Sequence, residues 1–264
     1  QVADRLDDRF RLLTGGSRTA LPRHRTLRAM IDWSWEPLTE PERLVLRRLS
    51  VFSGGASLEA AERVCTSDSV DAADVLELLT ALTEKSLVVT KDEGAPRYRM
   101  LGTIKEYASQ RLAEAGETDL ARHAHLAYFT ELVEIADPHL RRAEQLEWLV
   151  PLDVEHDNIN AAMRGTLASG EAQAAMRLAL AAGWYWWLGG HKAEANDMVI
   201  AATAIPGEVD PEVQALVYGF VVNFVVSGRS DQYEAADWIE KAPLDKTQRQ
   251  KICYKNAERV LKIK

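Results

Sequence analysis

The chain has 264 residues, of which 47% are hydrophobic and 27% charged, a composition that suits one large or two ordinary globular domains. Its net charge of −8 argues weakly against nucleic acid as the main partner. No apolar run approaches the roughly 18 residues that a membrane span needs, so we expect no membrane partner. The two cysteines are far apart and predict no disulfide, which favours the cytoplasm.

The first hundred residues read as short helices separated by glycine pairs. Val2 to Leu13 predicts a helix with an apolar stripe, and a second helix opens at Pro22. Thr39 predicts the start of a third helix, because Glu42 three residues later completes a capping box. We expect Ser57 and Asp71 to cap the next two helices, which run to Cys65 and to Glu84.

The hydrophobic period then changes. Residues 86–90 and 97–101 predict two short strands around the turn-forming residues 92–96. Three helices followed by a β-hairpin is the layout of a winged-helix domain.

From Thr103 onward the pattern is almost entirely helical, with glycines between the segments. Gly190 with Glu194, and Gly228 with Glu234, indicate two degenerate repeat units about 40 residues apart. The fold class is therefore mostly α: a winged-helix domain with one β-hairpin, followed by a TPR-like helical-repeat array. The predicted helices are 103–115, 120–136, 144–149, 154–168, 171–188, 193–204, 211–226, 231–240 and 246–263.

A winged-helix layout raises direct DNA binding as one hypothesis, because the helix before the hairpin then enters the major groove. Here that helix carries Asp71, Asp74, Glu77 and Glu84 against a single Lys85. The tip of the hairpin adds Asp92 and Glu93. Such a surface repels phosphates, whose attraction normally supplies most non-specific affinity. Direct DNA binding therefore ranks second to a protein-packing role, and DNA is expected to be an indirect partner.

A single basic cluster, Arg18 with Arg23, His24, Arg25 and Arg28, precedes and opens the second helix. It reads either as a solvated helix start or as a surface that faces a nucleotide or a neighbouring domain.

No residue pattern predicts catalysis. The chain has no phosphate-binding loop, since Gly15 and Gly16 are not followed by the required Lys-Ser/Thr pair. His123 and His125 lie two apart on a helix and point in different directions, so they cannot share a metal. We therefore expect no enzyme activity, no catalytic residue, no metal and no cofactor in this chain.

The consecutive aromatic residues Trp184, Tyr185, Trp186 and Trp187 cover most of a helix circumference. They read either as the core between packed repeat helices or as a surface that binds a partner, because Trp and Tyr are enriched at interface hot spots.

Several phrases read together resemble one known family, the bacterial STAND-class transcriptional regulators and ATPases of the antibiotic-regulator and LuxR-associated kind, which are relatives of NB-ARC proteins. The phrases that carry the resemblance are Arg5–Leu13, Leu21–Leu27, Ile31–Trp35, Leu46–Gly55, Leu82–Val89, Tyr98–Ala108 and Asp153–Ile159.

The resemblance implies a layout in which a nucleotide-binding domain of the same parent chain precedes Gln1 and binds ATP or ADP. Residues 1–20 would end its last helical subdomain, 21–116 would be the winged-helix domain, and 117–242 the helical repeats. In the family a Met-His-Asp motif places its His against the nucleotide. The matching positions here are Met100, Leu101 and Gly102, and Leu101 has no side-chain hydrogen bond to offer.

The last segment, residues 243–264, is rich in lysine, whereas the rest of the chain prefers arginine. It reads either as a simple basic helix or as a fused end, since it resembles the closing helices of metal-dependent amidohydrolases without their metal ligands. A hydrolase remnant is the remote alternative.

The hypothesis ranked first is a non-catalytic regulatory and sensor fragment of a STAND-type ATPase regulator. It would couple a nucleotide-dependent switch to a protein or small-molecule effector bound on the repeats. Arg23, His24, Arg25, Met100 and Leu101 would face the nucleotide domain, and the four aromatics from Trp184 to Trp187 would bind the partner.

Overall fold

The structure is a computed structural model that describes residues 22–91, 96–228 and 245–247. The described residues belong to two compact units, one ending at His125 and the other beginning at Leu126. The expected subdomain of residues 1–20, the turn residues 92–95, the helix 231–240 and nearly all of the lysine-rich end lie outside the described residues.

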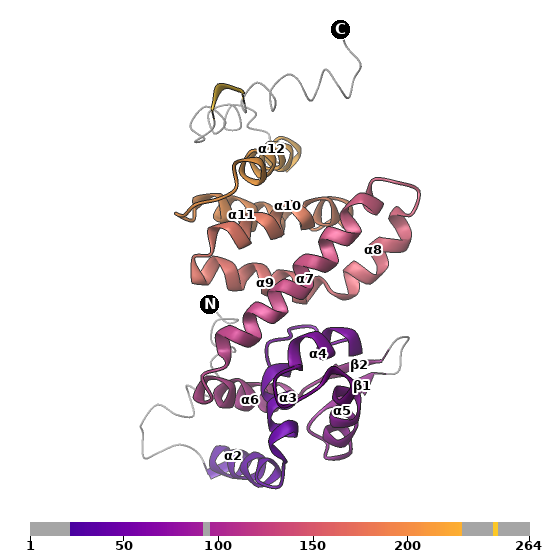
Figure 1. Ribbon diagram of the computed structural model, residues 1–264, viewed down its shortest axis with the longest axis vertical. Coiled ribbons are helices and arrows are strands. Elements are labelled where there is room, and N and C mark those ends of the chain that lie inside the picture. Colours follow the sequence, from indigo (N-terminus) through magenta and orange to yellow (C-terminus); the bar gives the residue numbers. More distant parts are fainter. Residues whose placement is uncertain (1–21, 92–95, 229–244, 248–264) are drawn as a thin grey trace. The chain divides into compact units, whose positions relative to one another are not determined.

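The first unit is built around one central helix, α3 (Glu40–Leu49), which packs against α4 (Leu58–Cys65), α5 (Val75–Glu84) and α6 (Gly102–Glu114) (Figure 1). A 3-10 turn, Ala72–Asp74, leads into α5, and α2 (Pro22–Trp35) precedes α3. The helices bury an apolar core against one another. Its residues include Leu44, Val45, Leu46, Leu49, Ala60, Val64, Val75, Leu79, Leu82, Ile104, Tyr107 and Leu112.

Two of the three predicted N-caps form in the structure, at Thr39 and Ser57. Thr39 accepts a hydrogen bond from the Glu42 backbone, and the Glu42 carboxylate accepts one from the Thr39 N–H at 2.8 Å, which confirms the capping box. The Ser57 hydroxyl accepts from the Ala60 N–H at 3.2 Å. The prediction for Asp71 is wrong, because the chain enters a 3-10 turn there and the Asp71 side chain makes no capping hydrogen bond.

A two-stranded antiparallel sheet follows the helices. β1 (Val89–Lys91) pairs with β2 (Arg97–Arg99), with Val89 opposite Arg99 and Lys91 opposite Arg97. Both strands are shorter than the sequence predicts. Ala56 forms an isolated antiparallel β-bridge with Tyr98 of β2. The Ala56 N–H donates to the Tyr98 carbonyl at 2.9 Å, and the Tyr98 N–H donates to the Ala56 carbonyl at 2.8 Å. This bridge ties the hairpin to the loop between α3 and α4.

The second unit is all helix within its described residues. The helix α7 (Thr118–Leu140) crosses the boundary between the units, and the array continues as antiparallel helices. These are α8 (Gln145–Val154), α9 (His156–Ser169), α10 (Ala172–Leu188), α11 (Lys192–Ala204) and α12 (Pro211–Gly228).

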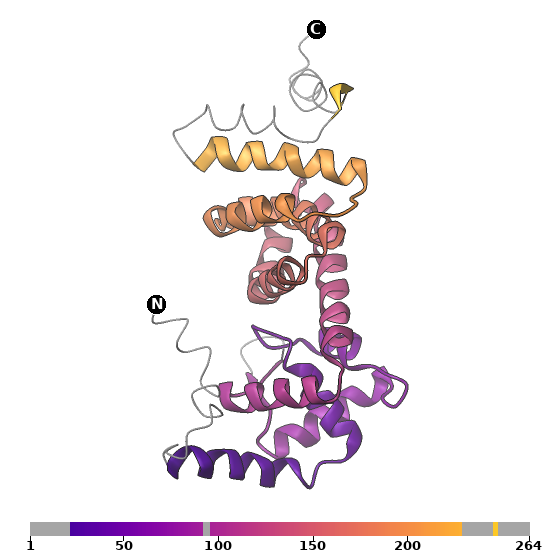
Figure 2. The ribbon, with the colours of Figure 1, turned by 90° about the vertical axis from the view of Figure 1, so that its left-hand side faces the viewer.

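The helix α10 is the centre of this array, and it contacts α9, α11 and α12. Figures 1 and 2 show α12 lying on the pair formed by α10 and α11. The approach of α12 is close, because a Cβ added at Gly183 would meet the Phe220 ring at 3.0 Å. The helices α9 and α11 begin 36 residues apart, near the period of helix-turn-helix repeats. The mostly α fold class, with a winged helix before the helical repeats, is confirmed.

Candidate nucleic-acid interface

The winged-helix unit presents two elements that could meet a duplex, the helix α5 and the β1–β2 hairpin. The helices α4 and α5 form the helix-turn-helix pair, in which the second helix is the one that usually enters the major groove. The chain folds this way locally because Val75, Leu79 and Leu82 place one apolar stripe of α5 in the core. The other face of α5 is left exposed.

That exposed face of α5 is acidic. It presents Glu77, Thr80 and Glu84 together with Leu76, which is 46% exposed. Residues 66–84 contain five acidic side chains and no lysine or arginine. Since phosphates carry the same charge sign, this face repels a DNA backbone.

The segment after α5 has the opposite charge. Residues 85–105 contain five lysines and arginines against two acidic residues. On β2, the buried Tyr98 points into the unit, so Arg97 and Arg99 lie on the other face of the strand.

One of these cations has a structural role. The Arg97 guanidinium donates to the Gly55 carbonyl at 2.9 Å and to the Gly54 carbonyl at 3.4 Å, which fixes the loop before α4. Gly55 has a φ of +80°, and a Cβ there would meet the Tyr98 carbonyl at 2.9 Å. Glycine is therefore required where this loop crosses the hairpin.

Lys85 is also committed to the fold. Its ammonium pairs with the Glu42 carboxylate of the capping box, whose side chain is 6% exposed. Burial acts to raise the pKa of Glu42, but the hydrogen bonds from Lys85 and Thr39 outweigh it and hold the pKa below its ordinary value.

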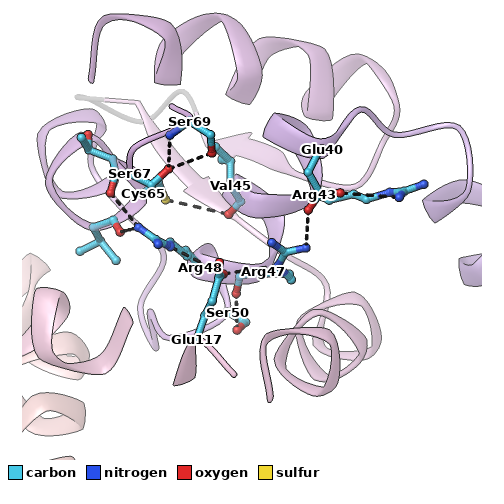
Figure 3. A network of polar contacts seen from close by, with 12 residues as sticks. Glu40, Arg43, Val45, Arg47, Arg48, Ser50, Cys65, Ser67, Ser69 and Glu117 are labelled. Atoms are coloured by element: carbon cyan, nitrogen blue, oxygen red, sulfur yellow. Dashed lines mark hydrogen bonds and ion pairs between the residues drawn. The ribbon is translucent and has the colours of Figure 1, made fainter. Parts of the chain in front are cut away.

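Two buried arginines on α3 form the polar network of Figure 3. Arg48 donates to the Thr66 carbonyl at 2.7 Å and to the Val64 carbonyl at 3.4 Å, so it satisfies carbonyls at the C-terminal end of α4. Arg47 pairs with Glu40 at 3.0 Å, and both arginines approach Glu117, at 3.5 and 3.8 Å. Both guanidinium groups are buried and bound within the unit, so they stabilise the core and do not serve as ligand-binding cations.

Cys65 lies in the same network, and its thiol is directed at the Val45 carbonyl at 3.9 Å. Burial raises the pKa of the Cys65 thiol to about 12. The thiol therefore stays protonated and unreactive in the folded state.

A second network joins α2 to α6. The Tyr107 hydroxyl donates to Asp32 at 2.6 Å and accepts from Arg111 at 2.6 Å, and Arg111 also reaches Asp32 at 3.2 Å. The Arg111 guanidinium lies 5.8 Å from the centre of the Trp35 ring. Sequence reasoning missed this network, because its members are up to 79 residues apart.

The residues predicted to face a nucleotide domain are dispersed along the unit. Arg23, His24 and Arg25 lie in the first turns of α2, and only their backbone is described. Met100 is half-buried, whereas Leu101 is 58% exposed and occupies the N-cap position of α6 without a capping hydrogen bond. Their facing a nucleotide domain stays a prediction.

The four consecutive aromatics of α10 divide into two pairs. Tyr185 and Trp186 have no exposed area, while Trp184 and Trp187 are half-buried. Trp184 meets the Phe220 ring edge-on at 5.8 Å, and the Lys192 ammonium lies 4.0 Å from the centre of the Trp187 ring. Any partner contact by this group therefore falls to Trp184 and Trp187.

The buried pair belongs to a hydrogen-bonded chain. Trp186 Nε1 donates to Asn160 Oδ1 at 3.1 Å. Because that oxygen is the acceptor, the Asn160 NH₂ group is the one that donates to His156 Nε2, at 2.9 Å. His156 Nδ1 then carries the proton and donates to the Tyr185 hydroxyl at 2.8 Å. Burial, followed by the nearby Asp153 carboxylate, raises the pKa of Tyr185. This chain gives α9 and α10 a specific packing register.

The described residues contain no group of three or more His, Cys, Asp or Glu side chains placed to hold a metal ion. None of the described helices combines the length and the apolar character needed to cross a membrane.

Comparison with known proteins identifies the first of these units. Residues 38–113 match the model of a winged helix-turn-helix domain, and this span covers α3 through the hairpin and nearly all of α6. No solved structure matches the chain.

Relatives occur in mycobacteria. The chain is 40% identical over 196 residues to proteins of Mycobacterium tuberculosis and Mycobacterium bovis that are provisionally named HTH-type transcriptional regulators. The alignment covers 74% of this chain and 22% of those proteins. An uncharacterized protein of Mycobacterium tuberculosis is 36% identical over 141 residues, or 52% of this chain and 36% of its own length. The chain thus spans about a fifth of the regulators that it matches.

Proposed function

We propose that this chain is part of a DNA-binding transcriptional regulator and that its winged-helix unit takes part in DNA binding. The observation that carries the proposal is the winged helix-turn-helix match over residues 38–113, joined to 40% identity with proteins named as transcriptional regulators. The order of elements in this unit supports it: the three helices α3, α4 and α5 are followed by the β1–β2 hairpin, and Ala56 in the loop between α3 and α4 bridges to that hairpin.

The comparisons favour this function over the one that the sequence analysis ranked first. That hypothesis placed direct DNA binding second, because α5 is acidic and the turn of the hairpin adds Asp92 and Glu93. The acidity of α5 argues against one contact surface only. It does not weigh against contacts made by other parts of the unit, such as the exposed Arg99 of β2.

The experiment is a selection of duplexes from a random-sequence pool by the 264-residue chain, followed by anisotropy titrations on the enriched duplexes. A DNA-binding regulator enriches a shared sequence and binds it with an affinity that falls steeply with salt. Failure to retain any duplex at low salt would overturn the proposal.

A second candidate is a regulatory clamp and sensor within a STAND-type ATPase switch. The acidic face of α5 favours it, since such a face suits protein packing better than phosphates. In this function α2 and the winged-helix unit close on an ADP-bound nucleotide domain, and an effector on the helical repeats releases them. The experiment is an immunoblot of source cells with an antibody to residues 21–116. A band several times heavier than 29.5 kDa is required, and a band at 29.5 kDa contradicts it.

A further inference from the structure

The helix α2 has a buried apolar face and an exposed one. On the buried face, Ile31 is 6% exposed and packs with Trp35 and with Tyr107 of α6. On the other face, Trp33 is 77% exposed and Met30 is 60% exposed. Tryptophan is on average a well-buried residue, and these two large side chains are neighbours, so they mark a candidate docking surface.

The shape of this surface suits another helix. Met30 and Trp33 are three residues apart, which makes them neighbours on the helix surface. Ala29 is also exposed and lies four residues before Trp33. Its small side chain leaves room for a second helix to come close. We call the surface formed by Ala29, Met30 and Trp33 the outer face of α2.

The chain itself contains a segment that fits this face. The sequence predicts a helix over Val2 to Leu13 with an apolar stripe that includes Leu6. This segment lies outside the described residues, and residues 14–21 join it to Pro22, where α2 begins. That connection can extend to about 25 Å, and packed helices lie about 8–10 Å apart. It is therefore long enough for the two helices to lie antiparallel.

The spacings along the two helices agree. Leu6 lies seven positions before Leu13, and Ala29 lies seven positions after Pro22. Both separations are about 10 Å, since a helix rises about 1.5 Å per residue. In an antiparallel pair with Leu13 level with Pro22, Leu6 meets Ala29. The N-terminal end of the predicted helix then reaches Trp33.

We propose that residues 2–13 form a helix that packs antiparallel on the outer face of α2 and covers Met30 and Trp33. The connection favours this occupant over a separate molecule, because a short flexible linker gives a millimolar effective concentration. The opposite side of α2 is bound to α6 through the hydrogen bond from Tyr107 to Asp32. The helix α2 would thus join this segment to the winged-helix unit, and the pairing does not depend on DNA binding.

The experiment is amide hydrogen exchange of the full chain, read by mass spectrometry on the peptides that contain residues 2–13. The test variants are Trp33→Ser on α2 and Leu6→Ser in the predicted helix. The matched control is Leu146→Ser on α8, because Leu146 is an apolar side chain of similar exposure, 74%, in the other unit. A thermal melt of each variant verifies that the proteins compared are folded.

We expect the amides of residues 2–13 to exchange about 10- to 100-fold more slowly than those of an unstructured peptide. This range follows from the burial of one or two large apolar side chains, which must be exposed again before the amides open. Trp33→Ser and Leu6→Ser should each remove most of this protection. Leu146→Ser should leave it unchanged.

Three outcomes would overturn the proposal. The first is exchange of residues 2–13 in the wild type at the rate of an unstructured peptide. The second is protection that persists in Trp33→Ser, since the segment would then pack elsewhere. The third is protection that rises with protein concentration, which would assign the outer face of α2 to a second copy of the chain.

Discussion

The Lys85 ammonium at the end of α5 pairs with the Glu42 carboxylate in the first turn of α3, 43 residues earlier in the chain. Glu42 is also the N3 residue of the capping box, so one carboxylate accepts from the Thr39 N–H at the start of α3 and pairs with Lys85 at the end of α5. The helix that a winged-helix protein usually presents to DNA is thus fixed to the central helix by a charged contact.

Replacing Lys85 by Met is expected to lower the free energy of unfolding by about 1–2 kcal/mol, because it leaves the buried Glu42 carboxylate without its charged partner. Equilibrium denaturation in urea measures this change. The control is Glu42→Gln combined with Lys85→Met, which should recover part of the loss. An unchanged stability in the single variant would show that the pair is too well solvated to matter.

The same pair predicts a dependence of stability on pH. The folded state holds the pKa of Glu42 below its ordinary value, so the unfolded state takes up the proton first as the pH falls. This contribution is complete above about pH 5 and is lost as the pH falls through the folded pKa. Urea denaturation at a series of pH values should therefore give a shallower acid loss for Glu42→Gln than for the wild type. Parallel curves would contradict the assignment.

Replacing Arg48 by Met should destabilise the first unit by roughly 2–3 kcal/mol, because the Thr66 and Val64 carbonyls lose their charged donor. The matched control is Arg63→Met on α4, an exposed arginine whose loss should change stability by less than about 0.5 kcal/mol. Both are read by urea denaturation, and similar values for the two variants would refute a special role for Arg48.

In the second unit, Trp186→Phe keeps an aromatic ring in the core and removes the donor to Asn160. We expect a loss of about 1–3 kcal/mol, because the buried Asn160 oxygen is left without that partner. The control is Trp184→Phe, since Trp184 is half-buried and outside this hydrogen-bonded chain. Equal losses in thermal melts of the two variants would mean that only ring volume matters.

The parts of the fold that depend on neighbours in sequence could be predicted. Thr39 and Ser57 cap helices through bonds to residues three positions later, so their sequence spacing contains the whole interaction. Asp71 has the right side chain in a suitable place, but a 3-10 turn comes before α5 and the cap does not form. Intrinsic capping preference does not decide which type of turn begins the helix.

The long-range contacts could not be predicted in the same way. The network of Asp32, Tyr107 and Arg111 joins residues that no periodicity relates, and it depends on how α2 is placed against α6. The charges that define the candidate DNA surface were visible in the sequence. Their arrangement was not, because it depends on which face of β2 packs into the unit: Tyr98 is buried, which leaves Arg97 and Arg99 on the other face.

The burial of Cys65 has a practical consequence. Its thiol is enclosed between α3 and α4 and is protonated at neutral pH, so a thiol reagent can attack it only when this packing opens. In a chain with Cys253 replaced by Ser, the rate of labelling would therefore measure how often the winged-helix core opens. A ligand that stabilises the core would slow the labelling of Cys65, and one that destabilises it would speed the labelling.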